Sequence, residues 1–228
     1  MLDFIFPEIP EWHTAKKAVE DGLIGKILNI NVDWTFLSYD LKNGIKSWKT
    51  DVEQGGGALS FYFSHTFHYL EYFIGRIASM QCSFSSSEKS MNGGETGINM
   101  TVLFENGCTG NAHMDISCAD QQKHVIEFHG EGGSIILQNI SNNFVDNFEL
   151  TVNTLKGIQK IKSDKALRSS HDESEDPRVK IITPVAERFI NWCNTGVTAK
   201  PDFQDGLRVQ ELIEMARSSD SKSYKIKT

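Results

Sequence analysis

The sequence contains 228 residues, enough for one large domain or two small ones, with the 39% hydrophobic and 23% charged residues of an ordinary soluble globular protein. The net charge is −7 and Lys and Arg do not cluster, which argues against nucleic-acid binding. No apolar run approaches the ~20 residues of a membrane span, and residues 1–10 contain no secretion signal, so we expect a cytoplasmic protein with no membrane partner.

The N-terminal part of the chain predicts a short strand, a helix and a longer strand. Residues 2–6 are apolar and typical of an edge strand ended by a proline. Pro10 suits the first turn of a helix and Gly22 suits its C-cap, which together predict a helix over 10–21. Residues 26–36 alternate apolar and polar side chains, the period-two pattern of a strand.

The middle of the chain predicts a loop, a buried helix and a run of strands. Residues 37–57 have no clear period and contain four glycines, so we expect a loop. Residues 58–74 are strongly aromatic and contain no helix breaker, which predicts a largely buried helix closed by Gly75. Strand patterns follow at 78–85, 98–104, 108–117, 124–129 and 134–138, with more strand within 148–161. Asn106-Gly107 predicts a hairpin between two of these strands, and Gly130 to Gly133 predicts another turn.

The C-terminal part predicts a polar loop, two helices and a last short strand. Residues 163–177 are rich in Ser, Asp and Glu and predict the loop. The helices are expected from Pro184 to about 194 and over 205–218, and the strand over 224–227. Because the strands come as a block, the predicted fold class is α+β, an open, mostly antiparallel β-sheet with helices packed on one face. We expect the other face to pair with a second copy, giving a homo-oligomer.

Segment 55–75 holds the residues that best suit chemistry. Residues three and four apart share a helix face, so the segment carries two stripes. The stripe expected to line a cleft consists of Phe61, His65, His68 and Tyr72. The stripe expected to face the core consists of Leu59, Phe63, Phe67, Leu70 and Ile74. Histidine transfers protons near neutral pH, which makes His65 and His68 candidate site residues. The alternatives are hydrogen-bonded structural histidines, or two ligands of a metal whose third ligand the spacing does not place.

A second candidate group lies in the loop before the glycines. Trp48, Lys49 and Asp51 suit sugar binding, because an aromatic ring packs on hydroxylated carbons while charged groups hold hydroxyls. The alternative is a solvated loop anchored by one tryptophan. Structural roles are expected for the strand residues His113, His124 and His129, and exposure for His13 and His171. The sequence contains neither a G-x-G-x-x-G fingerprint nor a P-loop.

Several short motifs come in an order and at separations that are quite specific together. They are Ile9–Trp12 with Ala15-Lys16, Gly22–Ile27, Trp48 before Gly55–Leu59, His65, Gly130–Ser134 and Asp205–Val209. Over nearly its whole length the sequence thereby resembles the glucose–fructose oxidoreductase, inositol dehydrogenase and MocA family. The resemblance implies a single substrate-binding and oligomerisation domain over residues 1–228. It also implies that the Rossmann domain, which binds NAD or NADP in full-length members, is absent from this chain.

The resemblance gives His65 a catalytic role. In family terms it would take the proton of a substrate hydroxyl while hydride leaves the same carbon for the nicotinamide. The family typically has Asp-x-Gly-x-His-x-x-Asp on this helix, whereas Phe61, Phe63 and His68 stand here in place of the first Asp, the Gly and the last Asp. A carboxylate one turn away would raise the His65 pKa, whereas Phe61 favours neutral imidazole and His68 adds repulsion at low pH.

Two hypotheses follow for the function. The first is the substrate-binding and oligomerisation domain of an NAD(P)-dependent oxidoreductase that acts on CH–OH groups of a sugar or polyol, inactive as this chain alone. It assigns catalysis to His65 and substrate contacts to Trp48, Lys49, Asp51 and His68. The second is a non-catalytic ligand-binding or assembly domain that kept the fold and lost the catalytic carboxylates.

Overall fold

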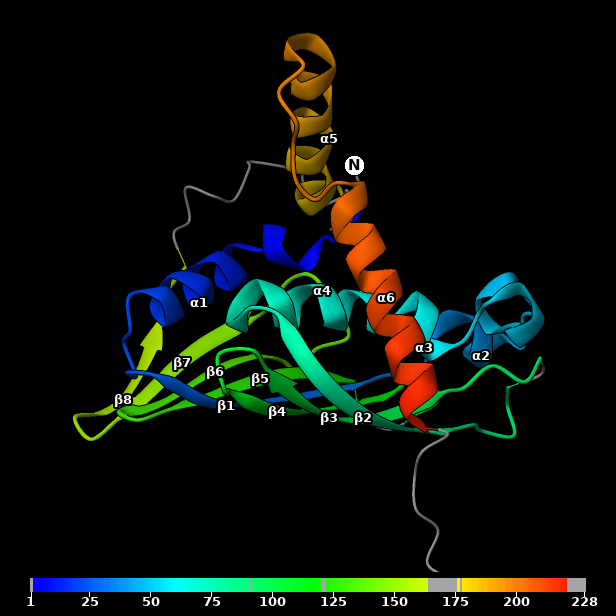
Figure 1. The fold of residues 1–228 in the computed structure, drawn as a ribbon, viewed down its shortest axis with the longest axis horizontal. Coiled ribbons are helices and arrows are strands. Elements are labelled where there is room, and N and C mark those ends of the chain that lie inside the picture. Colours follow the sequence, from blue (N-terminus) through cyan, green and yellow to red (C-terminus); the bar gives the residue numbers. More distant parts are fainter. Residues whose placement is uncertain (1, 91, 120–121, 164–175, 177, 221–228) are drawn as a thin grey trace, which may run out of the picture.

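A computed structural model describes residues 2–90, 92–119, 122–163, 176 and 178–220. These residues form one sheet of eight strands in the order β2-β3-β4-β1-β5-β6-β7-β8, with helices on one face (Figure 1). All neighbouring strands are antiparallel except the β1–β4 pair. The strands are β1 Ile27–Thr35, β2 Ile77–Ser85, β3 Gly97–Phe104, β4 Thr109–Asp115, β5 Lys123–Gly130, β6 Gly133–Asn139, β7 Glu149–Thr154 and β8 Gly157–Ile161. The predicted fold class is therefore confirmed.

The helices lie before, between and after these strands in the chain. They are α1 Pro10–Glu20, α2 Tyr39–Asn43, α3 Ala58–Phe61, α4 Phe63–Ile74, α5 Arg178–Thr195 and α6 Phe203–Asp220, with short 3-10 turns η1 Phe6–Glu8, η2 Trp48–Thr50 and η3 Val52–Gln54. The predicted first helix and every predicted strand between 26 and 161 are confirmed to within a few residues. Gly107 turns the β3–β4 hairpin with a φ of 84°, a conformation that favours glycine. No helix in the described part of the chain is long and apolar enough to cross a membrane.

Three predicted elements differ from the structure. Residues 2–6 form no strand, because the rings of Phe4 and Phe6 are buried in the helix layer and η1 already begins at Phe6. The loop over 37–57 contains α2, whose first turn is capped by Ser38 accepting a hydrogen bond from the Leu41 amide, as well as η2 and η3. The helix expected from Pro184 begins at Arg178, because Asp176 accepts from the Arg178 amide and so caps an extra turn.

The helix predicted over 58–74 is interrupted at Tyr62. The amide of His65 bonds the carbonyl of Tyr62, three residues back, which breaks the regular ladder between α3 and α4. The Tyr62 ring packs on Phe36 with ring centroids 5.0 Å apart. The break therefore sets the direction in which the histidine-bearing helix α4 runs.

The core lies between the helix layer and the sheet. Phe63, Phe67 and Leu70 of the predicted core stripe are fully buried, so that assignment is confirmed. The buried face of α4 is wider than one stripe and also includes Thr66, Tyr69 and Phe73. The predicted strand over 224–227, His171 and most of the loop over 163–177 lie outside the described residues.

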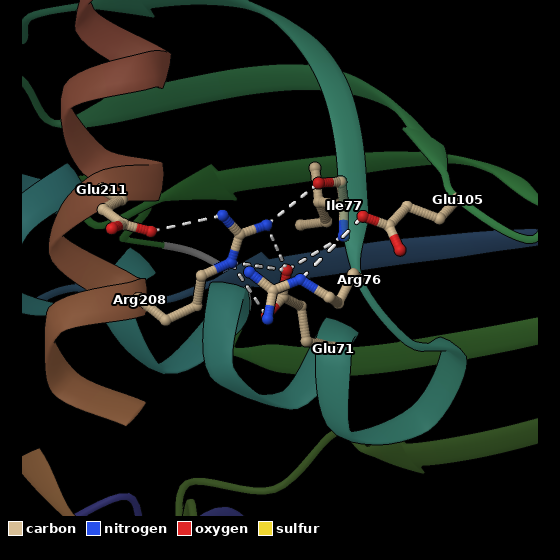
Figure 2. Close-up of polar contacts among 6 residues, drawn as sticks. All are labelled: Glu71, Arg76, Ile77, Glu105, Arg208 and Glu211. Atoms are coloured by element: carbon tan, nitrogen blue, oxygen red, sulfur yellow. Dashed lines mark hydrogen bonds and ion pairs between the residues drawn. The ribbon is translucent and has the colours of Figure 1, made fainter. Parts of the chain in front are cut away.

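An arginine clamp fixes α6 to the rest of the fold (Figure 2). The Arg208 guanidinium donates to Glu71 Oε1 at 2.8 Å and to the carbonyl of Ile77 at 2.9 Å. Glu71 Oε1 also accepts from the Ile77 amide at 2.9 Å. Both charged side chains are mostly buried, at 18% and 17% exposure, so the contact joins α6, α4 and the start of β2 through charge-assisted hydrogen bonds.

Candidate functional site

His65 lies at the start of α4 inside an aromatic enclosure. The rings of Phe4 and Phe6 stand edge-on to it, with centroids 5.7 and 5.6 Å away. The side chain is half-buried, and its Nδ1 atom is buried without a hydrogen-bond partner among the described residues. A buried polar atom with no partner is uncommon in a finished site. The Nδ1 atom of His65 can therefore take a hydrogen-bond partner from a ligand.

His68 follows one turn later and borders a cavity. The Phe4 ring stacks on it at 4.2 Å with an interplanar angle of 11°. His68 faces a cavity of about 260 Å³ between α4 and α6, and the other lining residues are Glu71, Tyr72, Asp205, Arg208 and Val209. The cavity thus presents charges of both signs and a phenol, which suits a small hydroxylated ligand.

Burial keeps both histidines neutral. Burial, with a smaller contribution from the nearby His68, lowers the pKa of His65 to about 4. Burial also lowers the pKa of His68 to about 4, although Asp205, Glu71 and Glu8 oppose this shift. The expected neutral imidazole and the expected repulsion from His68 are thus both present. The rings in contact with His65 are Phe4 and Phe6, however, and not Phe61, which packs elsewhere.

Trp48 and Lys49 gather around Phe61. The Trp48 ring stands edge-on to Phe61 at 5.5 Å, and Lys49 Nζ lies 4.7 Å from the centroid of the Phe61 ring. Trp48 is 52% exposed, so much of its ring is open to a ligand. η2 positions the pair, since Ser47 accepts a hydrogen bond from the Lys49 amide at its start.

Asp51 shapes the same loop. Its carboxylate accepts from the Glu53 amide at 3.0 Å and from the Gln54 side chain at 2.7 Å, which holds η3. The adjoining glycines admit a close approach of the chain to itself: a Cβ at Gly56 would lie 2.1 Å from the carbonyl oxygen of Trp48. Gly56 is therefore needed because the backbone of Trp48 lies too close to it for any side chain.

The five predicted site residues therefore fall into two groups, one in the loop before α3 and one on α4. Trp48, Lys49 and Asp51 lie before α3, whereas His65 and His68 lie on α4. Sequence reasoning missed Phe4, because residues 2–6 matched a strand pattern. It also missed the polar lining of the cavity, because Glu71 and Arg208 lie far apart in the sequence and come together only through the clamp.

His124 has the structural character expected of it. Its ring stacks on Trp34 at 4.5 Å, and its Nε2 lies 3.2 Å from the hydroxyl of Tyr69. Burial, with a smaller contribution from His65, lowers its pKa to about 3. Within the described ranges no group of three His, Cys, Asp or Glu side chains could hold a metal ion, so His65 and His68 gain no third ligand there.

Several solved structures that share this fold are oxidoreductases. The chain superposes on levoglucosan dehydrogenase in complex with NADH and levoglucosan with a TM-score of 0.80 and 21% identity, covering 97% of this chain and 64% of that one. An oxidoreductase from Agrobacterium radiobacter in complex with NAD⁺, L-tartaric acid and magnesium gives 0.76 and 15% identity, covering 99% and 64%. The fold is thus that of an α+β domain found in nicotinamide-dependent oxidoreductases.

The family follows from the sequence match. A family model described as the GFO/IDH/MocA C-terminal domain matches residues 12–136, more than half of the chain. The uncharacterised oxidoreductase sll0816 of Synechocystis sp. is 25% identical over 247 aligned positions, which cover 97% of this chain and 63% of that protein. The chain belongs to the GFO/IDH/MocA oxidoreductase family, and it spans less than two thirds of the length of these relatives.

Proposed function

We propose that these residues form the substrate-binding and assembly domain of an NAD(P)-dependent sugar or polyol oxidoreductase, and that this domain works with a dinucleotide-binding unit. The observation that carries the proposal is the neutral, enclosed His65 beside a polar cavity in a fold of oxidoreductase type. Structures of levoglucosan dehydrogenase contain levoglucosan or L-sorbose with NADH, which supports a sugar as the substrate class.

The residues that the structure describes contain no recognisable turn of the kind that binds a dinucleotide. In residues 2–90, 92–119, 122–163, 176 and 178–220, no strand leads through a glycine-rich turn into a helix whose N-terminus would hold a pyrophosphate. The Gly130–Gly133 segment joins two antiparallel strands as a hairpin. We therefore assign the binding of NAD or NADP to the dinucleotide-binding unit.

His65 is proposed to receive the proton of a substrate hydroxyl. Its imidazole is neutral at pH 7 and has an unpaired nitrogen, so it has a free lone pair or N–H for a substrate group. A pKa of about 4 makes it a weak base, and a negative or accepting group brought by a second unit would raise that pKa. His68 lines the neighbouring cavity and is proposed to hold a second hydroxyl.

Trp48 and Lys49 are proposed to bind the far end of the sugar. The exposed Trp48 ring offers a flat apolar surface for the carbon face of a sugar, and Lys49 offers three donors for its hydroxyls. Asp51 is proposed to contribute through the loop that it holds, although a direct contact remains compatible with its exposed carboxylate.

Homo-oligomerisation through the open sheet face is also proposed. This face carries side-chain pairs across neighbouring strands, Asn29 to Thr109 and Asn31 to Asn111 at 3.1 Å, and Asn99 to His113 at 2.9 Å. Such rows of donors and acceptors suit pairing with a second copy by hydrogen bonds. Light scattering at micromolar concentration should give the mass of a dimer or tetramer, and a monomeric mass would reject this part of the proposal.

The activity is tested by supplying a dinucleotide-binding unit. The full chain is mixed with the part of the Synechocystis relative that this chain does not match, and NAD⁺ or NADP⁺ reduction is followed over a panel of sugars and polyols. We expect reduction with at least one sugar and a loss of roughly 10²-fold or more for His65→Asn. His13→Asn, at an exposed position on α1, is the matched control and should retain the rate. Turnover that is unchanged in His65→Asn would reject the proton-transfer role.

A second candidate function is a ligand-binding or assembly domain without catalysis. It is favoured by Phe61 in the place of the usual carboxylate and by the weak basicity of His65. Under this candidate, calorimetry would detect sugar binding that is equal in wild type and His65→Asn, with no reduction of either cofactor.

A further inference from the structure

The cavity between α4 and α6 contains an arginine that would ordinarily attract an anion. Of the described residues that line this cavity, Arg208 is the one cation, because burial keeps His68 neutral. Arginine is well suited to carboxylates and phosphates, since two of its N–H groups can donate in parallel to two oxygens. A free Arg208 in this cavity would therefore favour sugar acids or sugar phosphates.

The guanidinium of Arg208 is already engaged by a carboxylate (Figure 2). Nη2 donates to Glu71 Oε1 at 2.8 Å and to the Ile77 carbonyl at 2.9 Å, and Nε donates to Glu71 Oε1 at 3.1 Å. Nη1 makes a longer contact of 3.4 Å with Glu211. Side-on pairing of a carboxylate uses Nε with Nη2, and end-on pairing uses Nη1 with Nη2. Both kinds of pairing therefore need a nitrogen whose protons are already donated.

An anionic ligand would have to displace Glu71 to reach the guanidinium. The Glu71 side chain is 17% exposed and also accepts a hydrogen bond from the Ile77 amide at 2.9 Å. If Glu71 were displaced, its carboxylate would lose the cation while remaining mostly buried, which is strongly unfavourable. The contact that fixes α6 to α4 thus also protects Arg208 from anions.

The charges around the cavity add to a negative field. The lining contains two carboxylates, Glu71 and Asp205, against the guanidinium of Arg208. Asp205 pairs with Lys200 Nζ at 3.1 Å, but the lysine is 64% exposed and its charge is screened by water. Burial lowers the pKa of His68, and the carboxylates of Asp205 and Glu71 oppose that shift. A second anion in the cavity would meet the same carboxylates and be repelled.

Uncharged polar groups in the same lining remain available to hydroxyls. His68 is neutral, and its Nδ1 has no hydrogen-bond partner among the described residues. Burial raises the pKa of Tyr72 to about 12, so its phenol stays protonated. Neutral imidazole and phenol each offer a donor or an acceptor that a hydroxyl can match. The cavity is therefore equipped for hydroxyls and closed to anions.

We infer that this cavity selects uncharged sugars or polyols against sugar acids and sugar phosphates, and that Glu71 sets the selection by occupying Arg208. The inference rests on the proposed function, in which this cavity holds part of the substrate. Glu71 then has two roles: it fixes α6 to α4, and it engages the group that would otherwise bind an anion. Removing its charge should open the cavity to anionic sugars.

The test measures the binding of sugars to the full chain by calorimetry, without a cofactor. The probes are two pairs that differ chiefly in one carboxylate, glucose with glucuronate and glucitol with gluconate. For wild type we expect the uncharged member of at least one pair to bind roughly tenfold or more tighter than the acid. Glu71→Gln removes the charge and keeps an acceptor for the Ile77 amide, so the acid should bind this variant roughly tenfold or more tighter than it binds wild type.

Glu211→Gln is the matched control. It makes the same chemical change beside the same guanidinium, but Glu211 is 53% exposed, contacts Arg208 at 3.4 Å and is not among the described residues that line the cavity. This variant should keep the preference of wild type, and an equal change in both variants would show a general charge effect and overturn the role of Glu71. Urea midpoints check that each variant is folded, and the wild-type comparison tests the selection without any variant.

The outcomes separate this inference from the proposed function. A wild type that binds each acid as tightly as its uncharged counterpart would overturn the selection, as would a folded Glu71→Gln with the wild-type preference. Binding of none of the probes would overturn it and also remove the cavity from the substrate site. Selective binding of an uncharged sugar, with no reduction of NAD⁺ or NADP⁺ in the mixed assay, would support the selection and reject the oxidoreductase function. Sugar-dependent reduction without selective binding would reject the selection alone.

Discussion

Acid should destabilise this domain because burial, complete for His124 and partial for His65 and His68, keeps three histidines neutral in the folded state. His65, His68 and His124 have folded pKa values of about 4, 4 and 3, against an ordinary value of 6.5. Below pH 6.5 the unfolded chain binds protons at these sites and the folded chain does not. The contribution to stability is therefore complete above pH 6.5 and is lost as pH falls from 6.5 towards 4.

The size of the effect follows from the pKa values. One pKa unit corresponds to about 1.4 kcal/mol, so at pH 5 each histidine favours unfolding by about 2 kcal/mol and the three together by about 6 kcal/mol. A domain of ordinary stability, about 5–15 kcal/mol, would lose a large part of it. The free energy of unfolding should be measured in urea at pH 7.5, 6 and 5, for wild type and for His124→Gln.

The variant provides the control. His124→Gln removes one titrating group, so the loss of stability per pH unit between 6 and 5 should fall by about 1.4 kcal/mol, whatever the variant does to stability at pH 7.5. A free energy of unfolding that is constant from pH 7.5 to 5 would refute the reasoning. An identical pH slope in wild type and variant would refute the role of His124.

Three further predictions follow from the contacts described above. Arg208→Ala should destabilise the fold by about 2–4 kcal/mol because it leaves the mostly buried carboxylate of Glu71 without its cation. Arg178→Ala removes an exposed ion pair and should not change the urea midpoint. Equal urea midpoints for the two variants would contradict the clamp. Phe4→Ala should admit water to His65 and raise its pKa towards 6.5 in an NMR titration, and an unchanged titration would show that other groups bury this ring. Trp48→Ala should change stability by less than about 1 kcal/mol, since the ring is 52% exposed, but should weaken sugar binding by about tenfold in calorimetry. Unchanged sugar affinity would remove Trp48 from the site.

Most of the fold could be predicted from the sequence because its local signals agree with its long-range packing. The period-two pattern over 26–36 gave β1, and Asn106-Gly107 gave the β3–β4 hairpin. The core-facing side of α4 could be predicted because Phe63, Phe67 and Leu70 recur at helical spacing. These features depend on residues close in sequence, where a pattern is informative.

The errors occurred where tertiary contacts decided the structure. Residues 2–6 have a strand pattern, but the rings of Phe4 and Phe6 pack on the histidines of α4 instead. Tyr62 is an acceptable helix residue, and nothing local in the sequence marks the break it makes. Pro184 is a common first-turn residue, yet α5 begins six residues before it, at Arg178, and Ile181 in the added segment is buried.

The candidate site was predictable only in part for the same reason. His65 and His68 were found from helical spacing and from resemblance, and both border the enclosure or the cavity. The walls of the site come from Phe4, far from them in sequence, and from Arg208 at the other end of the chain. No local signal joins such residues, so their role emerges only from the fold.

The central claim is that another unit, and not this domain, binds the dinucleotide. Titrating NADH and NADPH into the full chain by calorimetry tests this claim most directly. We predict no binding of either dinucleotide, because no strand-to-helix phosphate turn occurs in the described residues. Binding with a micromolar Kd would contradict the proposal and would place the cofactor on this domain itself.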